Sequence, residues 1–183
     1  MIRFFDVFLS SIGLIGLMPV MLALTVICYF DTGSPIFPQL RVGRFKKKFL
    51  IYKFRTMRLD APMMPTHKID KDYVTHVGVF LRRTKLDELP QLWNVLIGDM
   101  SLVGPRPCLE TQYRLIELRE HVNLFDIKPG ITGEAQLGGV DMSDAEKLVE
   151  VELGMKDKWA MSTYAACLIN TVFGLLGYRH DRL

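Results

Sequence analysis

Two adjacent carboxylates, Asp87 and Glu88, are the residues of this sequence best placed to do chemistry. A cluster of cations lies in the turn before them: Arg82, Arg83 and Lys85. A helix N-terminus and nearby cations both favour an ionised carboxylate, so we expect a lowered pKa and an ionised Asp87 at neutral pH. An ionised carboxylate suits a nucleophile or a metal ligand. Adjacent helical positions point about 100° apart, which predicts different roles for the two residues.

Two loops further along the chain favour this chemistry over the alternative, an acidic helix cap with solvated basic neighbours. In Gly104-Pro105-Arg106-Pro107 the prolines fix φ on both sides of Arg106, which can then be presented rigidly to a phosphate. Lys128 and Gly130 lie in a second loop, where backbone N–H groups can cradle a phosphate. Turn formation explains this second loop equally well.

Local patterns predict the elements that position these residues. Residues 33–38 predict a turn-rich connection, and residues 49–55 a short strand. Pro90 and the apolar spacing after it predict a helix over residues 87–98, and a polar-faced helix follows at about 108–121. Ser143 with Glu146 predicts a capping box that opens a helix to about 156. For the apolar residues 160–178 the sequence leaves two alternatives: a segment that packs on the core or one that lies on a membrane surface.

Residues 7–30 contain no charged side chain. A helix over this run would be long enough to cross a ~30 Å hydrocarbon core. Pro19 interrupts this run near its middle, and Asp6 before it argues against a signal peptide. Basic residues flank both ends, with Arg3 before the run and a cluster at 41–58 after it. The positive-inside rule then favours a re-entrant helix-break-helix over the alternative, a proline-kinked span.

The chain has 183 residues, of which 49% are hydrophobic and 23% charged, and this composition predicts one folded domain rather than disorder. Three scattered cysteines support neither a disulfide framework nor a zinc ribbon and favour a reducing compartment. Residues 1–58 carry a net charge of +7 and residues 59–183 a net charge of −4. The basic block indicates an anionic partner, and its place next to an apolar run favours lipid headgroups or phosphorylated substrates over nucleic acid.

Longer motifs identify a family. They lie at residues 39–43, 52–57, 82–92, 94–107 and 129–136, and they include Tyr52-Lys53-Phe54-Arg55, Leu86-Asp87-Glu88-Leu89-Pro90 and Gly104-Pro105-Arg106-Pro107. In this order the chain resembles the small monotopic phosphoglycosyl transferases, bacterial sugar transferases that start glycoconjugate assembly on a polyprenol phosphate.

The resemblance implies a mixed α/β, mainly helical fold. Residues 1–31 would form a re-entrant membrane helix broken at Pro19, and residues 32–183 a compact cytoplasmic catalytic domain with interfacial helices, one structural unit with the anchor. The protein would then lie on the cytoplasmic face of a bacterial inner membrane. It would be the minimal catalytic form, without the additional membrane-spanning region of larger relatives.

The resemblance also implies a reaction. Asp87 would attack the β-phosphate of a UDP-sugar and release UMP with the help of Mg²⁺, held by Asp87 and Glu88. Polyprenol (undecaprenyl) phosphate would then take the sugar phosphate from the aspartyl intermediate. Glu88 would act as a base or metal partner, and further residues would bind substrate or phosphate: Arg55, Arg82, Arg106, Gly104, Pro107, Lys128 and Gly130. Membrane lipids and, in a homodimer, a second copy of the chain would be the other partners.

The C-terminal part departs from the family pattern. Val140 stands where the family has an arginine, and a later Asp…Tyr signature reads Glu152 and Met155. Met18 replaces the usual serine before Pro19. These departures leave the donor sugar open, and they are the only support for the alternative function, a non-catalytic membrane scaffold or lipid-headgroup binder.

Overall fold

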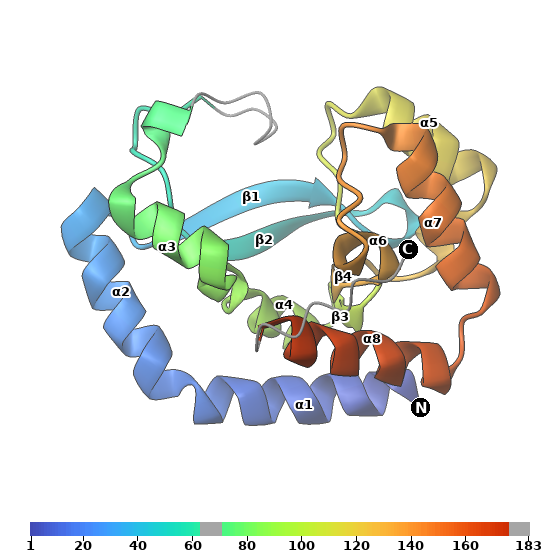
Figure 1. The fold of residues 1–183 in the computed structure, drawn as a ribbon, viewed down its shortest axis with the longest axis horizontal. Helices are drawn as coiled ribbons and strands as arrows, with labels where there is room; N and C mark the ends of the chain where they lie inside the picture. The colour runs from blue at the N-terminus through green and yellow to red at the C-terminus, as the bar shows by residue number, and fades with distance from the viewer. Residues whose placement is uncertain (63–70, 176–183) are drawn as a thin grey trace.

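The computed structural model describes residues 1–62 and 71–175 (Figure 1). It is a mixed α/β structure in which helices predominate, as predicted. An antiparallel ribbon of β1 (Ile36–Val42) and β2 (Lys48–Phe54) and a short parallel pair, β3 (Ser101–Val103) and β4 (Gly130–Thr132), are the strands among the described residues. Helices surround both pairs, with α1 along the lower edge of the view in Figure 1.

The N-terminal apolar run forms two helices, α1 (Ile2–Gly16) and α2 (Met18–Thr32), that meet at Leu17 and are bent by 63°. Pro19 lies in the first turn of α2, where its missing N–H removes no intrahelical bond. Neither helix, nor any other single helix in the described part of the chain, has the length and apolar composition to cross a membrane, although this bent pair meets that test together. Exposed apolar side chains cover the pair: Phe4, Phe8, Ile12, Ile15, Leu22 and Phe30.

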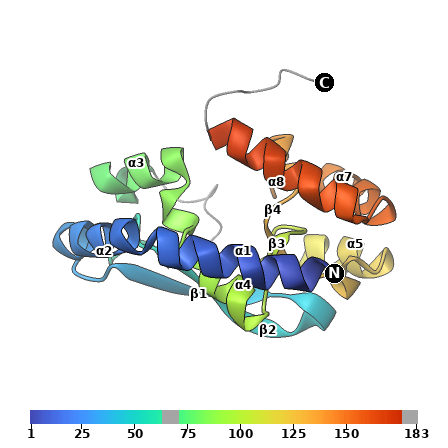
Figure 2. The same cartoon turned by 90° about the horizontal axis from the view of Figure 1, so that it is seen from below.

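A buried carboxylate attaches α1 to the rest of the chain. Oδ1 of Asp6 accepts hydrogen bonds from the hydroxyl of Ser101 (2.9 Å), the N–H of Leu102 (2.9 Å) and the hydroxyl of Tyr164 (2.8 Å). These bonds join α1 to β3 and to α8 (Met161–Leu175). In the view of Figure 2, β3 and β4 lie between the two helices. Burial and Asp6 together raise the pKa of Tyr164, so its hydroxyl stays a donor at neutral pH. The start of the apolar run is therefore fixed in the core.

The β1–β2 ribbon is only partly as the sequence predicts. The strand predicted at 49–55 is β2, but its partner β1 begins at Ile36, inside the segment 33–38 where we expected turns. Pro38 is tolerated in β1 because Tyr52, its partner across the ribbon, gives its N–H to the side chain of Asn94. The amide of Asn94 in turn donates to the carbonyl of Leu50 (2.7 Å), so one buried side chain holds the free edge of β2.

The helix predicted over 87–98 is divided in two. Leu86–Glu88 form one 3₁₀ turn, and α4 (Gln91–Ile97) begins only after Pro90. Gly98 ends α4 in the left-handed region (φ 100°), as its position predicts. Arg3 of α1 donates to the carbonyls of Val95 (2.5 Å) and Leu96 (2.8 Å), which would otherwise lack partners at this helix end.

Two predicted helices differ in extent or capping from the prediction, and two further helices were not predicted. The helix expected at 108–121 is shorter, α5 (Tyr113–His121), and α3 (His76–Thr84) precedes the carboxylate pair. A single turn, α6 (Glu134–Leu137), follows β4, and α7 (Ala145–Asp157) is the helix expected to end near 156. The capping box at Ser143 is wrong, because Asp144 caps α7 by accepting the N–H of Lys147 (3.0 Å) while Ser143 bonds to Asp141.

The core has three parts. The central one joins β2, α4, β3 and α8 through Ile51, Val95, Met100, Val103 and Tyr164. A second lies between α5 and α7, and a third joins α2 to β2 and α3. Of the two alternatives for residues 160–178, α8 packs on the core through Tyr164 and Cys167 while Ile169, Val172 and Phe173 stay exposed; the residues after 175 lie outside the described part. All three cysteines are free and buried.

Candidate active site

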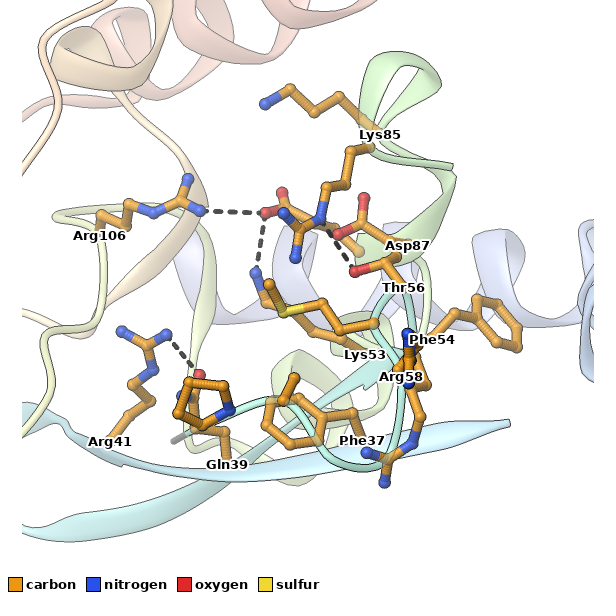
Figure 3. Close-up of a pocket in the computed structure, with 16 residues that line it drawn as sticks. Phe37, Gln39, Arg41, Lys53, Phe54, Thr56, Arg58, Lys85, Asp87 and Arg106 are labelled. Atoms are coloured by element: carbon orange, nitrogen blue, oxygen red, sulfur yellow. Dashed lines mark hydrogen bonds and ion pairs between the residues drawn. The ribbon is translucent and has the colours of Figure 1, made fainter. Parts of the chain in front are cut away.

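A cavity of about 260 Å³ lies between the β ribbon, α3, the 3₁₀ turn and the loop after β3 (Figure 3). Two carboxylates, Asp87 and Glu88, line it. Its cationic lining is larger: Arg41, Lys53, Arg55, Arg58, Arg82, Lys85 and Arg106. Such an excess of positive charge around two carboxylates favours a ligand that carries several negative charges.

The carboxylate pair is presented by a tight turn rather than by a regular helix. Lys85 before it adopts the left-handed conformation (φ 60°), which ends α3 and starts the turn. Within the turn the two side chains point to different surroundings, as expected for neighbouring positions. Asp87 is buried, and the side chain of Glu88 is only 13% exposed.

Glu88 is held by two cations from distant parts of the chain. Lys53 of β2 donates to its Oε1 (3.0 Å), and Arg106 contacts the same oxygen at 3.4 Å. Burial by itself would raise the pKa of Glu88, but the charges of Lys53 and Arg106 outweigh it and hold this pKa at about 2. Glu88 therefore remains ionised, with one oxygen already engaged.

Asp87 has the opposite environment. No hydrogen bond or ion pair to its carboxylate is present among the residues that the structure describes. Burial, and then the charge of Glu88, raise its pKa, against the opposing charges of Lys53, Arg82 and Lys85. The lowered pKa that the sequence predicts is therefore wrong: loss of water and a neighbouring carboxylate act more strongly than the cations.

Arg82 and Arg55 both reach the cavity, as predicted. Arg82 in the last turn of α3 donates through Nε to the hydroxyl of Thr56 (2.9 Å). The close approach of α3 to the loop after β2, which contains Thr56, requires Gly78, because a Cβ there would lie 2.0 Å from the carbonyl oxygen of Thr56. Arg55 donates to the carbonyl of Ser34 (3.0 Å) and lies over the ring of Phe37, with Cζ 5.1 Å from the ring centroid.

The backbone N–H groups of Gly104 and Gly130, in the two predicted phosphate-binding loops, form hydrogen bonds within the protein. The N–H of Gly104 bonds to Thr132 and the N–H of Gly130 to Pro105, so neither is open to a phosphate. A Cβ on Gly104 would lie 2.3 Å from the carbonyl oxygen of Lys128. Glycine is therefore needed where the segments around residues 104 and 128–130 pass each other. The two glycines thus support the loop that carries Arg106.

Lys128 is not brought to the dyad. Among the described residues it lines none of the cavities beside Asp87 and Glu88; a Cβ at Gly98 would lie 3.5 Å from its Nζ and 3.3 Å from Nη2 of Arg3. Burial and then the charge of Arg3 lower the pKa of Lys128. Pro107 does not line the cavity of the dyad; it lines a small neighbouring pocket, which Glu88 also lines, and its carbonyl accepts a hydrogen bond from Arg41 (3.0 Å).

The sequence did not single out Lys53, Arg41 or Lys85 as residues that bind substrate or phosphate, although all three line the cavity with the dyad. The first two lie in the family motifs, and strand alternation is the signal that could have found them. Lys53 and Arg41 share the face of the ribbon that carries Phe37 and Ile51. Their convergence on Glu88 depends on how the ribbon packs, which no local pattern gives.

No cluster of three or more His, Cys, Asp or Glu side chains able to hold a metal occurs within residues 1–62 and 71–175. The dyad itself offers two carboxylates. Mg²⁺ commonly binds one or two carboxylates together with phosphate oxygens of a substrate, so the residues present fit a metal that arrives with its phosphorylated ligand.

The site is a cation-rich cavity around a carboxylate pair, in a chain whose N-terminal helices form a bent apolar pair. The chain belongs to the bacterial sugar transferase family, which matches residues 1–177. This membership confirms the resemblance drawn from the motifs.

Individual relatives give the same picture. The chain is 36% identical to the galactosyl transferase CpsE of Streptococcus agalactiae over 87% of its own length and 38% of that protein. It is 36% identical to a UDP-glucose:undecaprenyl-phosphate glucose-1-phosphate transferase of Escherichia coli, covering 92% and 38% of the two chains. The sugar transferase EpsL of Bacillus subtilis, of uncharacterised activity, is 38% identical over 86% and 78%. The chain therefore spans about two fifths of the length of the first two relatives.

Proposed function

We propose that this protein transfers a sugar 1-phosphate from a UDP-sugar to undecaprenyl phosphate, with polyprenyl-diphosphosugar and UMP as products. The observation that carries the proposal is the contrast within the dyad: Glu88 is bonded to two cations, whereas Asp87 is buried beside cations without a bonded partner among the described residues. The names of relatives support the substrate classes, since one is a UDP-glucose:undecaprenyl-phosphate glucose-1-phosphate transferase.

In the first half-reaction an ionised Asp87 oxygen attacks the β-phosphorus of the donor. A new P–O bond forms to Asp87, the P–O bond to the bridging oxygen breaks, and its electron pair leaves with UMP. Asp87 suits this role because its lone pairs are not bound by a donor. Glu88, with one oxygen held by Lys53 and Arg106, instead orients these two cations toward the phosphates.

In the second half-reaction a phosphate oxygen of undecaprenyl phosphate attacks the same phosphorus, and the bond to Asp87 breaks. The carboxylate is thereby regenerated, and the product carries the new diphosphate. Arg82, fixed on Thr56, and Arg55, fixed on Ser34, lie on the cavity wall where they contact phosphate oxygens in this proposal. One cavity thus serves both substrates in turn.

Asp87 and Glu88 are the residues that would hold Mg²⁺, and phosphate oxygens of the donor would be further ligands. When bound, the metal would neutralise charge on the diphosphate.

We further propose that α1 and α2 form a re-entrant anchor on the cytoplasmic face of the inner membrane, with the exposed stripe of α8 at the interface. The support is that both ends of the pair attach to the same body. Asp6 near the start of α1 bonds to β3, and Asp31 near the end of α2 accepts a hydrogen bond from Thr75 at the start of α3 (2.6 Å). A span would separate these ends by the bilayer.

Topology is tested by cysteine labelling in intact cells. Cysteines introduced at Arg3 and Lys47 should both react only from the cytoplasmic side, while the three native cysteines are buried. Labelling from opposite sides would overturn the re-entrant arrangement.

The reaction is tested by measuring UMP release with undecaprenyl phosphate, Mg²⁺ and a panel of UDP-sugars that includes UDP-glucose and UDP-galactose. Asp87→Asn should lose UMP release by about 10³-fold or more, because an amide is not a nucleophile here. Asp157→Asn, an exposed carboxylate of α7, is the matched control and should keep native activity. Equal release by Asp87→Asn and native protein would refute the nucleophile. Failure of native protein with every donor would favour the scaffold alternative.

A further inference from the structure

A second cavity of about 310 Å³ adjoins the one that holds the dyad. It lies toward α5 and α6, and polar side chains such as Gln112, Gln136 and Asp141 line it. Three cations line both cavities: Arg41, Lys85 and Arg106. These residues therefore mark the junction between the two cavities.

Arg41 at this junction is held in place by neutral acceptors. Its Nη1 donates to the carbonyl of Pro107 (3.0 Å) and its Nη2 to Oε1 of Gln39 (2.5 Å). Its buried Nε has no hydrogen-bond partner within the part of the chain that the structure describes. No carboxylate lies within ion-pair distance of Arg41 among those residues. Its position is thus fixed while its charge is not compensated by a direct partner.

A second guanidinium, that of Arg106, lines the same two cavities as Arg41. Burial, and then the charge of Arg106, lower the pKa of Arg41 to about 10. Arg106 reaches Glu88 only at 3.4 Å, and that same oxygen already accepts from Lys53. Two like charges at the edge of a cavity are unfavourable unless an anion lies between them.

We propose that Arg41 and Arg106 together bind a phosphate group at the junction of the two cavities. A phosphate suits the pair because guanidinium groups bind its oxygens with charge-assisted hydrogen bonds, and it would compensate both charges at once. The site lies beside the dyad, since Arg106 also contacts Glu88. The inference rests on the proposed function for the source of the phosphate, which is the diphosphate of the donor or the phosphate of the lipid acceptor.

The first part of the test measures binding by the whole chain in detergent, without turnover, so that this part is independent of the reaction; the KM for undecaprenyl phosphate is measured separately. The dissociation constants of UDP and of uridine are determined for native protein and for Arg41→Gln. Arg44→Gln is the matched control: Arg44 lies in the same basic block, donates to the carbonyl of Asp126 (2.7 Å) and lines neither cavity.

If the phosphate belongs to the donor, Arg41→Gln weakens UDP binding about 10–100-fold, the range expected for one charge-assisted contact, and uridine binding less than twofold. If it belongs to the acceptor, UDP binding is unchanged and the KM for undecaprenyl phosphate rises by a similar factor. Arg44→Gln should change neither. Unchanged values for both substrates, or equal losses for UDP and uridine, would overturn the site.

Because Arg41 also holds Pro107 and Gln39, Arg41→Lys is a second variant that keeps the charge. It should bind UDP, or use the acceptor, severalfold less well than native protein at an unchanged unfolding temperature; native affinity for both would overturn the site. UDP binding that depends on Arg41 in a protein that turns over no donor would leave the site standing and refute the proposed reaction. Turnover unaffected by Arg41→Gln and Arg41→Lys would refute the site and leave the proposed reaction standing.

Discussion

The strongest test of the fold concerns a buried ion pair, Arg119 of α5 with Glu152 of α7. Nε of Arg119 donates to one carboxylate oxygen (2.9 Å) and Nη2 to the other (2.6 Å). The side chains are only 3% and 1% exposed. Burial raises the pKa of Glu152, although Arg119 and the backbone N–H of Arg106 oppose this. The pair therefore joins two helices and supports the loop that carries Arg106.

Glu152→Gln would leave the charge of Arg119 buried without a counter-ion. Breaking one partner of a buried pair costs about 3–5 kcal/mol of unfolding free energy, whereas replacing both partners with apolar residues is often close to neutral. For a chain of this length 1 kcal/mol shifts Tm by about 2–4 °C, so the single variant should lose about 6–20 °C. The Tm of the double variant Arg119→Met with Glu152→Leu should fall far less than the sum of the losses in Arg119→Met and Glu152→Leu measured alone.

Thermal unfolding of native protein, Arg119→Met, Glu152→Leu and the double variant in one detergent measures the coupling, and Glu152→Gln is measured beside them. Glu117→Gln, an exposed carboxylate whose partner Arg114 also contacts Glu146, is the control and should change Tm by less than 2 °C. A Tm of Glu152→Gln within 2 °C of native, or additive losses in the double variant, would refute the buried pair.

Three further predictions follow from other contacts. Asp6→Ala removes three hydrogen bonds and leaves the N–H of Leu102 buried without a partner, so it should cost about 2–5 kcal/mol in thermal unfolding; an unchanged Tm would contradict this attachment of α1. Gly78→Ala places a Cβ 2.0 Å from a backbone oxygen and should lower Tm by the equivalent of about 1–3 kcal/mol, whereas Gly154→Ala, with open space around it, should not. Because Asp87 must lose a proton to attack and its pKa is raised, UMP release should fall as pH falls through that pKa; Lys53→Met removes a cation that lowers it, so the fall should move to higher pH, and a limb at the native position would refute this.

The sequence by itself determined the family and the broken apolar run, and it singled out the residues that we propose as reactive. These features are local: the Asp87-Glu88 pair, the prolines around Arg106 and Pro19 in the apolar stretch can each be read within a few residues. The strand at β2 and the stop of α4 at Gly98 are also local, since aromatic and β-branched content and a left-handed glycine need no distant partner. Family motifs added Arg55 and Arg82, both of which line the cavity.

Tertiary structure decided what each carboxylate of the dyad experiences. Lys53 reaches Glu88 from 35 positions away in the chain, and burial raises the pKa of Asp87, which local charge counting predicted to fall. Likewise Gly130 is needed for close passage of two strands, and Pro38 is accepted in β1 because its neighbour bonds elsewhere. The physical reason is the same in each case: desolvation and long-range contacts depend on which surfaces pack together, and the pattern along the chain carries no record of that.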